Sequence, residues 1–222
     1  MKEKGQGTGD RGQGIGAGEL QGISNSRGSR PKRVAVLGAT GSIGRNTLDV
    51  IERDRDGFEV VLLSANSDCA GLDEAGSRWP GAAGILCGED GGRERLFAAI
   101  AESGAEITVN GISGAAGLEP SMAAIEAGSD LALANKETLV MAGGLVMSRA
   151  REMGVRVIPV DSEHSPVSAL LEAHCRDSAD LSSVDEIILT ASGGPFRKLS
   201  AAEMAAATPA QAMADPTWNM GA

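Results

Sequence analysis

The sequence predicts an α/β fold in which a doubly wound parallel sheet is followed by an incomplete α+β domain. From residue 32 onward, short apolar runs typical of buried strands alternate with longer stretches of helical spacing. This alternation indicates a parallel sheet whose crossovers are right-handed. Residues 1–31 lack this alternation and are rich in Gly, Ser, Gln and charged residues, which predicts a disordered N-terminal extension.

Six short, mostly apolar segments are predicted to be buried parallel strands. These ranges are 34–37, 60–63, 83–86, 107–109, 131–134 and 155–158. Helical patterns fill the gaps, and the clearest lie at 46–53, 96–102, 120–127 and 138–153. The first of these helices has Leu48 and Ile51 three residues apart, on one face.

After residue 163 the regular alternation of strand and helix patterns ends, which predicts a domain boundary near residue 160. A helix is expected at 166–175, a strand at 184–190, a short helix at 201–207 and a loop from 208 to 222. Residues 32–160 are therefore expected to form one domain, and residues 161–222 part of a second, incomplete one.

Composition excludes several classes of function. The net charge of −10 argues against nucleic-acid binding, and no apolar stretch is long enough to span a membrane. The chain has no tyrosine, so it cannot supply the Tyr-x-x-x-Lys acid of short-chain dehydrogenases. Three irregularly spaced cysteines (Cys69, Cys87 and Cys175) indicate a reducing compartment without a disulfide framework. A bacterial cytoplasmic location is expected, and acidic residues near the N-terminus disfavour a plastid transit peptide.

A glycine-rich turn at residues 38–44 joins the first strand to the first helix, as the dinucleotide-binding fingerprint of Rossmann-like folds requires. Gly38 would allow the tight turn, Gly41 the approach of a pyrophosphate, and Gly44 close packing of helix on strand. The spacing is G-x-x-G-x-x-G, and a plain glycine-rich turn remains the alternative.

The end of the second strand favours NADP over NAD. An acidic residue at this place would bind the ribose 2′-hydroxyl and repel a 2′-phosphate. Here residues 64–67 are Ser-Ala-Asn-Ser, which are neutral and include hydrogen-bond donors. Asp68 lies slightly further on and is evidence against this preference.

Polar residues follow the last two strands of the first domain. Asp161 and Glu163 come directly after the apolar run at 155–160, where they could hold a hard divalent cation or simply cap and start a helix. Lys136, within residues 133–137, could face cofactor and substrate or belong to a solvated helix start. Residues 192–194 resemble an anion nest, with a simple turn as the alternative. Trp218 could close over a ligand or fill a hydrophobic gap.

Taken in order, these segments resemble the 1-deoxy-D-xylulose-5-phosphate reductoisomerase family. The matching segments are 38–44, 111–118, 133–137, 159–164, 189–197 and 216–221. The resemblance implies an NADPH-dependent oxidoreductase that uses a divalent metal (Mg, Mn or Co). Such an enzyme converts 1-deoxy-D-xylulose 5-phosphate to 2-C-methyl-D-erythritol 4-phosphate in non-mevalonate isoprenoid biosynthesis. The resemblance also implies a homodimer at full length.

The resemblance assigns roles to individual residues. Metal ligands would be Asp161 and Glu163. Catalytic groups would be Lys136 and Glu163. Substrate contacts would come from Ser162, Glu163, Ser192 and Trp218. Contacts with NADPH would come from Gly38, Thr40, Gly41, Ser42, Ile43, Asn66, Asn135, Glu137 and Met220.

Two departures from the family qualify this expectation. Asp215 stands where the family usually has a histidine near the substrate phosphate, and a carboxylate there would repel the dianion. The family also continues beyond residue 222 with further phosphate ligands and a third metal carboxylate. The chain is therefore expected to be a fragment that is inactive by itself, the alternative being a non-catalytic NADP-binding module.

Overall fold

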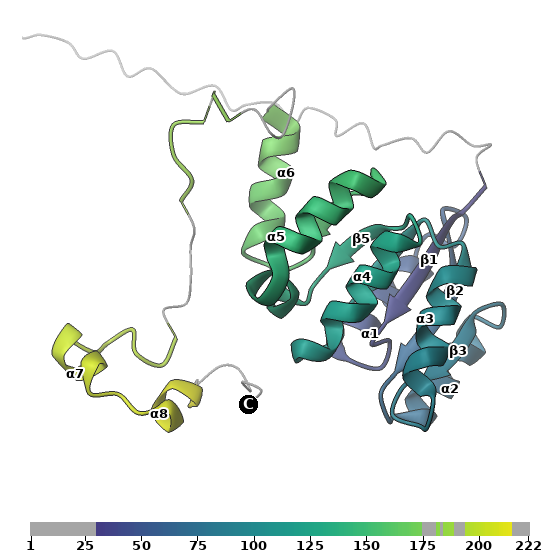
Figure 1. Ribbon diagram of the computed structural model, residues 1–222, viewed down its shortest axis with the longest axis horizontal. Coiled ribbons are helices and arrows are strands. Elements are labelled where there is room, and N and C mark those ends of the chain that lie inside the picture. Colours follow the sequence, from purple (N-terminus) through teal and green to yellow (C-terminus); the bar gives the residue numbers. More distant parts are fainter. Residues whose placement is uncertain (1–29, 175–180, 183, 189–193, 215–222) are drawn as a thin grey trace, which may run out of the picture. The chain divides into compact units, whose positions relative to one another are not determined.

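The computed structural model describes residues 30–174, 181–182, 184–188 and 194–214. In these residues six parallel strands form one sheet in the order β3-β2-β1-β4-β5-β6 (Figure 1). They are β1 (Lys32–Leu37), β2 (Phe58–Ala65), β3 (Ala83–Leu86), β4 (Ile107–Asn110), β5 (Asp130–Leu133) and β6 (Val157–Pro159). The predicted doubly wound, Rossmann-like sheet is confirmed.

The helices follow the strands in the alternating order that the sequence predicts. They are α1 (Ser42–Glu52), α2 (Cys69–Arg78), α3 (Gly92–Ser103), α4 (Leu118–Glu126), α5 (Lys136–Met153) and α6 (His164–His174). A short 3-10 helix, η1 (Gly114–Gly117), precedes α4, and two further short helices are α7 (Ala201–Ala205) and α8 (Pro209–Met213). None of the helices in the described residues is both long and apolar enough to cross a membrane.

Two buried clusters cover the two faces of the sheet, because successive side chains of a strand point to opposite faces. One cluster joins β1 to α1 and α2 through Val34, Val36, Leu48, Ile51 and Leu72. The other joins β1 to α3, α4 and α5 through Ala35, Leu37, Leu96, Ile125 and Val146. The sheet therefore lies between two helical layers, and its strand ends are left to form a site.

Helix α1 begins at Ser42, four residues before the predicted start, because the glycine turn already contains its first turn. The buried residues Gly44, Leu48 and Ile51 recur at helical spacing along its inner face. Gly41 occupies the N-cap position and provides no side-chain cap. The backbone at this helix N-terminus is therefore not covered by a capping side chain.

Two predictions for the C-terminal part are wrong. Residues 184–188 form no strand, and Ile187 and Ile188 are 53% and 73% exposed. A strand needs a partner ladder, and no described strand lies beside this segment. The expected loop from residue 208 contains α8, which Thr208 starts through a capping box with Gln211. Residues 189–190 lie outside the described residues.

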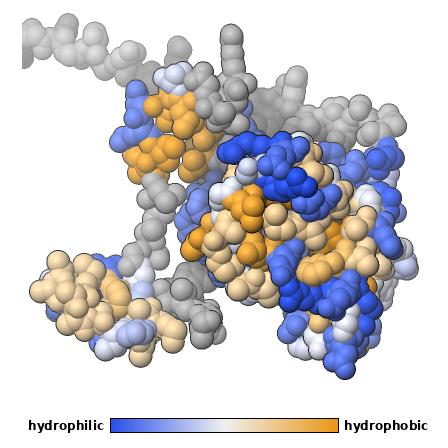
Figure 2. All heavy atoms as spheres, viewed as in Figure 1, coloured by the Kyte–Doolittle hydropathy of each residue, from blue (hydrophilic) through white to orange (hydrophobic). Residues whose placement is uncertain are grey.

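Helices α5 and α6 each expose apolar side chains (Figure 2). Val140 and Leu145 on α5 are 84% and 62% exposed, and Leu170 on α6 is 62% exposed. The predicted disorder of residues 1–31 falls almost wholly outside the described part, and the boundary near residue 160 stays a prediction.

Candidate nucleotide and metal site

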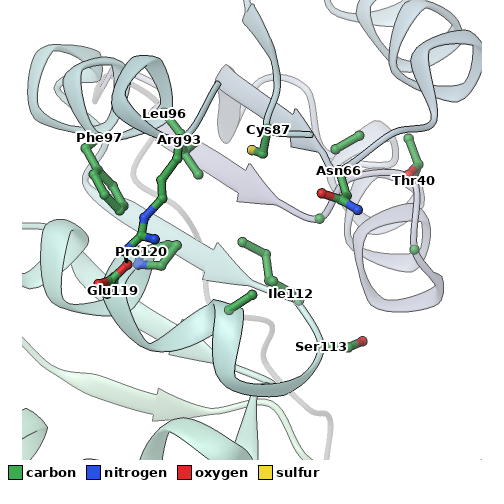
Figure 3. A pocket seen from close by; sticks show the side chains of 15 residues that line it. Thr40, Asn66, Cys87, Arg93, Leu96, Phe97, Ile112, Ser113, Glu119 and Pro120 are labelled. Carbon is green, nitrogen blue, oxygen red and sulfur yellow. Dashed lines mark ion pairs between the residues drawn. The ribbon is translucent and has the colours of Figure 1, made fainter. Parts of the chain in front are cut away.

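A cavity of about 520 Å³ lies at the carboxyl ends of β1, β2, β3 and β4. Its walls come from the turns after these strands and from α3 and α4 (Figure 3). Strand β1 is paired with β2 on one side and with β4 on the other, so the strand order reverses at this point. Open α/β sheets bind their ligands at such a switch point.

The glycine turn forms one wall of this cavity, and the three glycines act differently. Gly38 has a φ of +78° and would place an added Cβ 3.0 Å from the Gly111 backbone. A Cβ at Gly44 would lie 2.3 Å from the Gly38 carbonyl oxygen, so only glycine permits this close packing. A Cβ at Gly41 would meet only the Gly38 oxygen, at 3.4 Å. Gly41 thus keeps the start of α1 open toward the cavity.

The end of β2 supplies a second wall. Ser64 is buried, and its hydroxyl oxygen accepts a hydrogen bond from the Gly38 N–H at 3.3 Å, which ties β2 to the glycine turn. Asn66 is exposed and lines the cavity on the same side as Thr40 (Figure 3). Asp68 caps α2, because its Oδ1 accepts a hydrogen bond from the Gly71 N–H at 2.9 Å. Asp68, whose charge is evidence against NADP in the sequence, therefore serves as the N-cap of α2.

Two buried asparagines hold the third wall, residues 112–117, and their structural role could not be seen in the sequence. The Asn135 amide donates to the carbonyls of Ile112 at 2.6 Å and Gly114 at 2.8 Å. Its Oδ1 accepts from the N–H and the hydroxyl of Thr138, at 2.8 and 2.6 Å, and so caps α5. Asn110 holds the same wall through the Gly117 carbonyl at 2.8 Å.

Asn135 stays a predicted cofactor contact, and the structure shows how its side chain is held. The side chain is 2% exposed, and both amide hydrogens and the amide oxygen have protein partners. Its task is to position the cavity wall. Glu137 lies half-buried in the first turn of α5 and stays a predicted cofactor contact.

On the far side of the cavity, Arg93 of α3 and Glu119 of α4 form an ion pair (Figure 3). The Arg93 guanidinium lies 5.6 Å from the Phe97 ring centre. Cys87 also lines the cavity, and burial raises the pKa of its thiol. The neighbouring Asp73 carboxylate raises the pKa of Cys69. A raised pKa leaves less of the reactive thiolate at neutral pH, so neither thiol is activated as a nucleophile.

The predicted lysine and carboxylates meet at the next two strand ends. Lys136 follows β5 and Asp161 follows β6, and these strands are neighbours in the sheet. The Lys136 Nζ lies 3.3 Å from Asp161 Oδ2. The Glu163 N–H donates to Asp161 Oδ1 at 3.2 Å, and the Ser162 hydroxyl donates to Glu163 Oε2 at 3.0 Å. Residues from two separate sequence motifs thus form one polar cluster.

Asp161 is the most enclosed member of this cluster, with a side chain that is 11% exposed. A side-chain hydrogen bond with Glu163 is the largest cause that lowers the pKa of Asp161, to about 2. Burial opposes the shift, while the Glu163 N–H and the Lys136 ammonium add to it. Asp161 is therefore a carboxylate throughout the neutral pH range.

The cluster also contains His164, which sequence reasoning missed. Its Nδ1 lies 3.3 Å from Asp161 Oδ1. The signal was the spacing of three residues from Asp161, which lies in the turn that leads into α6 at His164. Within the described ranges, no group of three or more His, Cys, Asp or Glu side chains is arranged to hold a metal ion. Two carboxylates and coordinated water still suit magnesium, which often takes only one or two protein carboxylates.

Five further residues discussed from the sequence lie outside the described residues. They are Cys175, Ser192, Asp215, Trp218 and Met220.

Comparisons with known proteins point to one family. A family model for 1-deoxy-D-xylulose 5-phosphate reductoisomerase matches residues 34–83 and 78–143, and a model for the C-terminal domain of that enzyme matches residues 157–222. The 1-deoxy-D-xylulose 5-phosphate reductoisomerase of Zymomonas mobilis subsp. mobilis is 43% identical over 211 residues. That match covers 87% of this chain and 53% of the relative, so the chain spans about half the length of the curated relatives it matches.

Two solved structures extend the comparison to the fold. The Zymomonas mobilis enzyme in complex with NADPH has a TM-score of 0.69 and 41% identity, covering 84% of this chain and 52% of that one. A DOX-P reductoisomerase in complex with NADPH, fosmidomycin and magnesium has a TM-score of 0.66 and 30% identity, covering 86% of this chain and 52% of that one. The chain belongs to the 1-deoxy-D-xylulose 5-phosphate reductoisomerase family.

Proposed function

We propose that the chain provides the NADPH site and part of the metal and substrate site of a 1-deoxy-D-xylulose 5-phosphate reductoisomerase. The product would be 2-C-methyl-D-erythritol 4-phosphate, as expected in non-mevalonate isoprenoid biosynthesis. The observation that carries the proposal is the distance of 3.3 Å between Lys136 Nζ and Asp161 Oδ2. Lys136 directly follows Asn135 in the chain. Asn135 holds the wall of the nucleotide cavity, so one helix start links the two sites.

NADPH would lie in the cavity with its pyrophosphate at the start of α1. Backbone N–H groups at a helix N-terminus suit phosphate, and Gly41 leaves this one without a side-chain cap. Thr40 and Gly41 line the cavity, and Ser42 and Ile43 open α1 beside it. Asn66 would contact the adenosine half. The NADPH bound by the Zymomonas mobilis relative supports this assignment.

A divalent metal would be held by Asp161 and Glu163. When bound, it would act as a Lewis acid on the substrate carbonyl. Asp161 needs no deprotonation for this task, because its pKa is lowered to about 2. Lys136 would orient substrate oxygens and balance negative charge, and Ser162 would contact the substrate. The magnesium in the related DOX-P reductoisomerase structure supports the choice of metal.

The remaining assignments are part of the same proposal. Glu137 and Met220 would contact NADPH, and Ser192 and Trp218 would contact the sugar phosphate. Homodimer formation is also proposed, with the exposed apolar side chains of α5 and α6 as its support.

The test uses this chain extended with the remaining half of the Zymomonas mobilis relative. We expect NADPH oxidation that requires both 1-deoxy-D-xylulose 5-phosphate and magnesium, and that Asp161→Asn abolishes. Asp56 is exposed in the turn between α1 and β2, away from both sites, so Asp56→Asn serves as a matched charge control. Turnover that survives Asp161→Asn would refute the proposed metal site.

A second candidate is NADP binding without turnover by the 222-residue chain itself. It is favoured by the absence, within the described ranges, of a group of three or more metal-binding side chains. We expect NADPH binding but no oxidation with the sugar phosphate. Turnover by the 222-residue chain would reject this candidate and favour the complete reaction.

A further inference from the structure

Arg45 lies in the first turn of α1 and faces the turn that follows β2. Its Nη2 is 3.8 Å from Asp68 Oδ2, and its side chain is 67% exposed. Arg45 also lines a second hollow of about 190 Å³ between α1 and α2. Thr40 lines both this hollow and the nucleotide cavity, so the two share a rim. The Arg45 guanidinium therefore lies beside the part of the nucleotide cavity that Asn66 lines.

Asp68 holds this cation only loosely. The Arg45–Asp68 distance of 3.8 Å is too long for a hydrogen bond, and exposed ion pairs of this kind contribute little to stability. The other oxygen of Asp68 accepts the capping hydrogen bond from Gly71 at 2.9 Å. Asp68 is thus committed to α2, while the guanidinium of Arg45, with its five donors, can turn toward a ligand.

The chemistry of this corner matches a phosphate ester. In dinucleotide-binding folds, an acidic residue at the end of the second strand favours NAD, and a nearby arginine accommodates the 2′-phosphate of NADP. Here that position holds Asn66 and Ser67, which are neutral and exposed. Arginine is the side chain best suited to bind two phosphate oxygens at once.

We propose that Arg45, together with Asn66 and Ser67, binds the 2′-phosphate of NADPH and sets the preference for NADPH over NADH. This inference rests on the proposed nucleotide function and adds a specificity-determining residue to it. Arg45 pairs with Asp68 in the absence of nucleotide and leaves Asp68 when the 2′-phosphate binds.

The first test titrates the 222-residue chain with NADPH and with NADH and follows the fluorescence of each nucleotide. Arg45→Gln should raise the Kd for NADPH roughly tenfold, as expected for a lost hydrogen bond to a charged group, and leave the Kd for NADH unchanged. Arg45→Lys should fall between wild type and Arg45→Gln, because the charge remains without the two-pronged geometry. Arg53→Gln, at the other end of α1, is the matched control and should change neither Kd.

The second test uses Asp68→Asn, which keeps an N-cap side chain and removes the charge. It should tighten NADPH binding by about threefold, the range of one weak exposed ion pair, without changing NADH binding. The inference is overturned if Arg45→Gln leaves the preference intact or weakens both nucleotides equally, or if Asp68→Asn weakens NADPH. If the wild-type chain binds neither nucleotide, the proposed function fails as well; if it binds NADPH and Arg45→Gln keeps the preference, only the inference fails.

Discussion

Replacing Asn135 with aspartate tests the wall of the nucleotide cavity, because the two side chains have the same shape. The introduced carboxylate would still accept the hydrogen bonds from Thr138, at 2.8 and 2.6 Å, and so keep the cap of α5. It would lose both hydrogens that Asn135 donates to the carbonyls of Ile112 and Gly114. Leaving two buried acceptors facing a carboxylate should cost about 3 kcal/mol.

The cost should depend on pH, since burial beside two carbonyl oxygens raises the pKa of the new carboxyl group above its unfolded value of about 3.9. The folded variant then binds more protons than the unfolded one, so its stability falls as pH rises through that window. At low pH the introduced aspartic acid is neutral and can donate one hydrogen bond, so the loss in the free energy of unfolding should be smaller. At neutral pH the full deficit should lower Tm by roughly 6 to 12 °C.

Thermal and urea unfolding between pH 4 and pH 8, with NADPH titration at neutral pH, would measure these effects. Asn46→Asp is the matched control for the unfolding measurements, because Asn46 is exposed on α1 and the same change there adds a surface charge without removing a buried donor. The assignment of Asn135 as a buried donor to this wall would be refuted if Asn135→Asp lowered the free energy of unfolding by less than about 1 kcal/mol. It would also be refuted if the loss were equal at every pH.

The remaining predictions concern the glycine turn and the carboxylate. Gly44→Ala should destabilise the chain by about 1 to 3 kcal/mol in urea unfolding, because its Cβ would lie 2.3 Å from the Gly38 carbonyl oxygen. Gly41→Ala should change Tm much less and yet weaken NADPH binding in titrations; a larger loss of Tm than in Gly44→Ala would contradict the assigned roles. Calorimetry with Mn²⁺ should give weak binding that Asp161→Asn abolishes, and binding that survives would place the metal elsewhere. Asp161 has a pKa of about 2 in the folded chain against about 3.9 unfolded, so its contribution to stability is present above pH 4 and is lost as pH falls toward 2. Acid unfolding of Asp161→Asn should lack this share of the pH dependence.

The sheet could be predicted from the sequence because each buried strand is a local apolar run. Strand β3 begins and ends at the predicted residues, and the other five overlap their predicted ranges. The segment at 184–188 has the same local appearance but forms no strand, since pairing depends on a neighbour that the segment itself does not specify. Local composition can identify a candidate strand, but only the fold can provide its partner.

The candidate site was predictable where strand order alone brings residues together. Lys136 and Asp161 are 25 residues apart, yet each directly follows one of two neighbouring strands, so the meeting of their side chains follows from the topology. The hydrogen bonds of Asn135 to residues 112 and 114 depend on the path of a loop, which no periodicity encodes. The sequence therefore indicated that Asn135 belongs to the site but not that its side chain is already fully bonded.

Asp68 shows why a motif rule needs the geometry of each oxygen. By its place after β2 it resembles the acid that selects NAD, and by its type it weighs against NADP. In the structure one oxygen caps α2 and the other faces Arg45, so the carboxylate has partners of its own before any nucleotide arrives. A charge that is already paired repels a phosphate less than a free one, and the arginine that pairs it can itself bind that phosphate. The same residue that seemed to oppose NADPH thus becomes part of the argument for it.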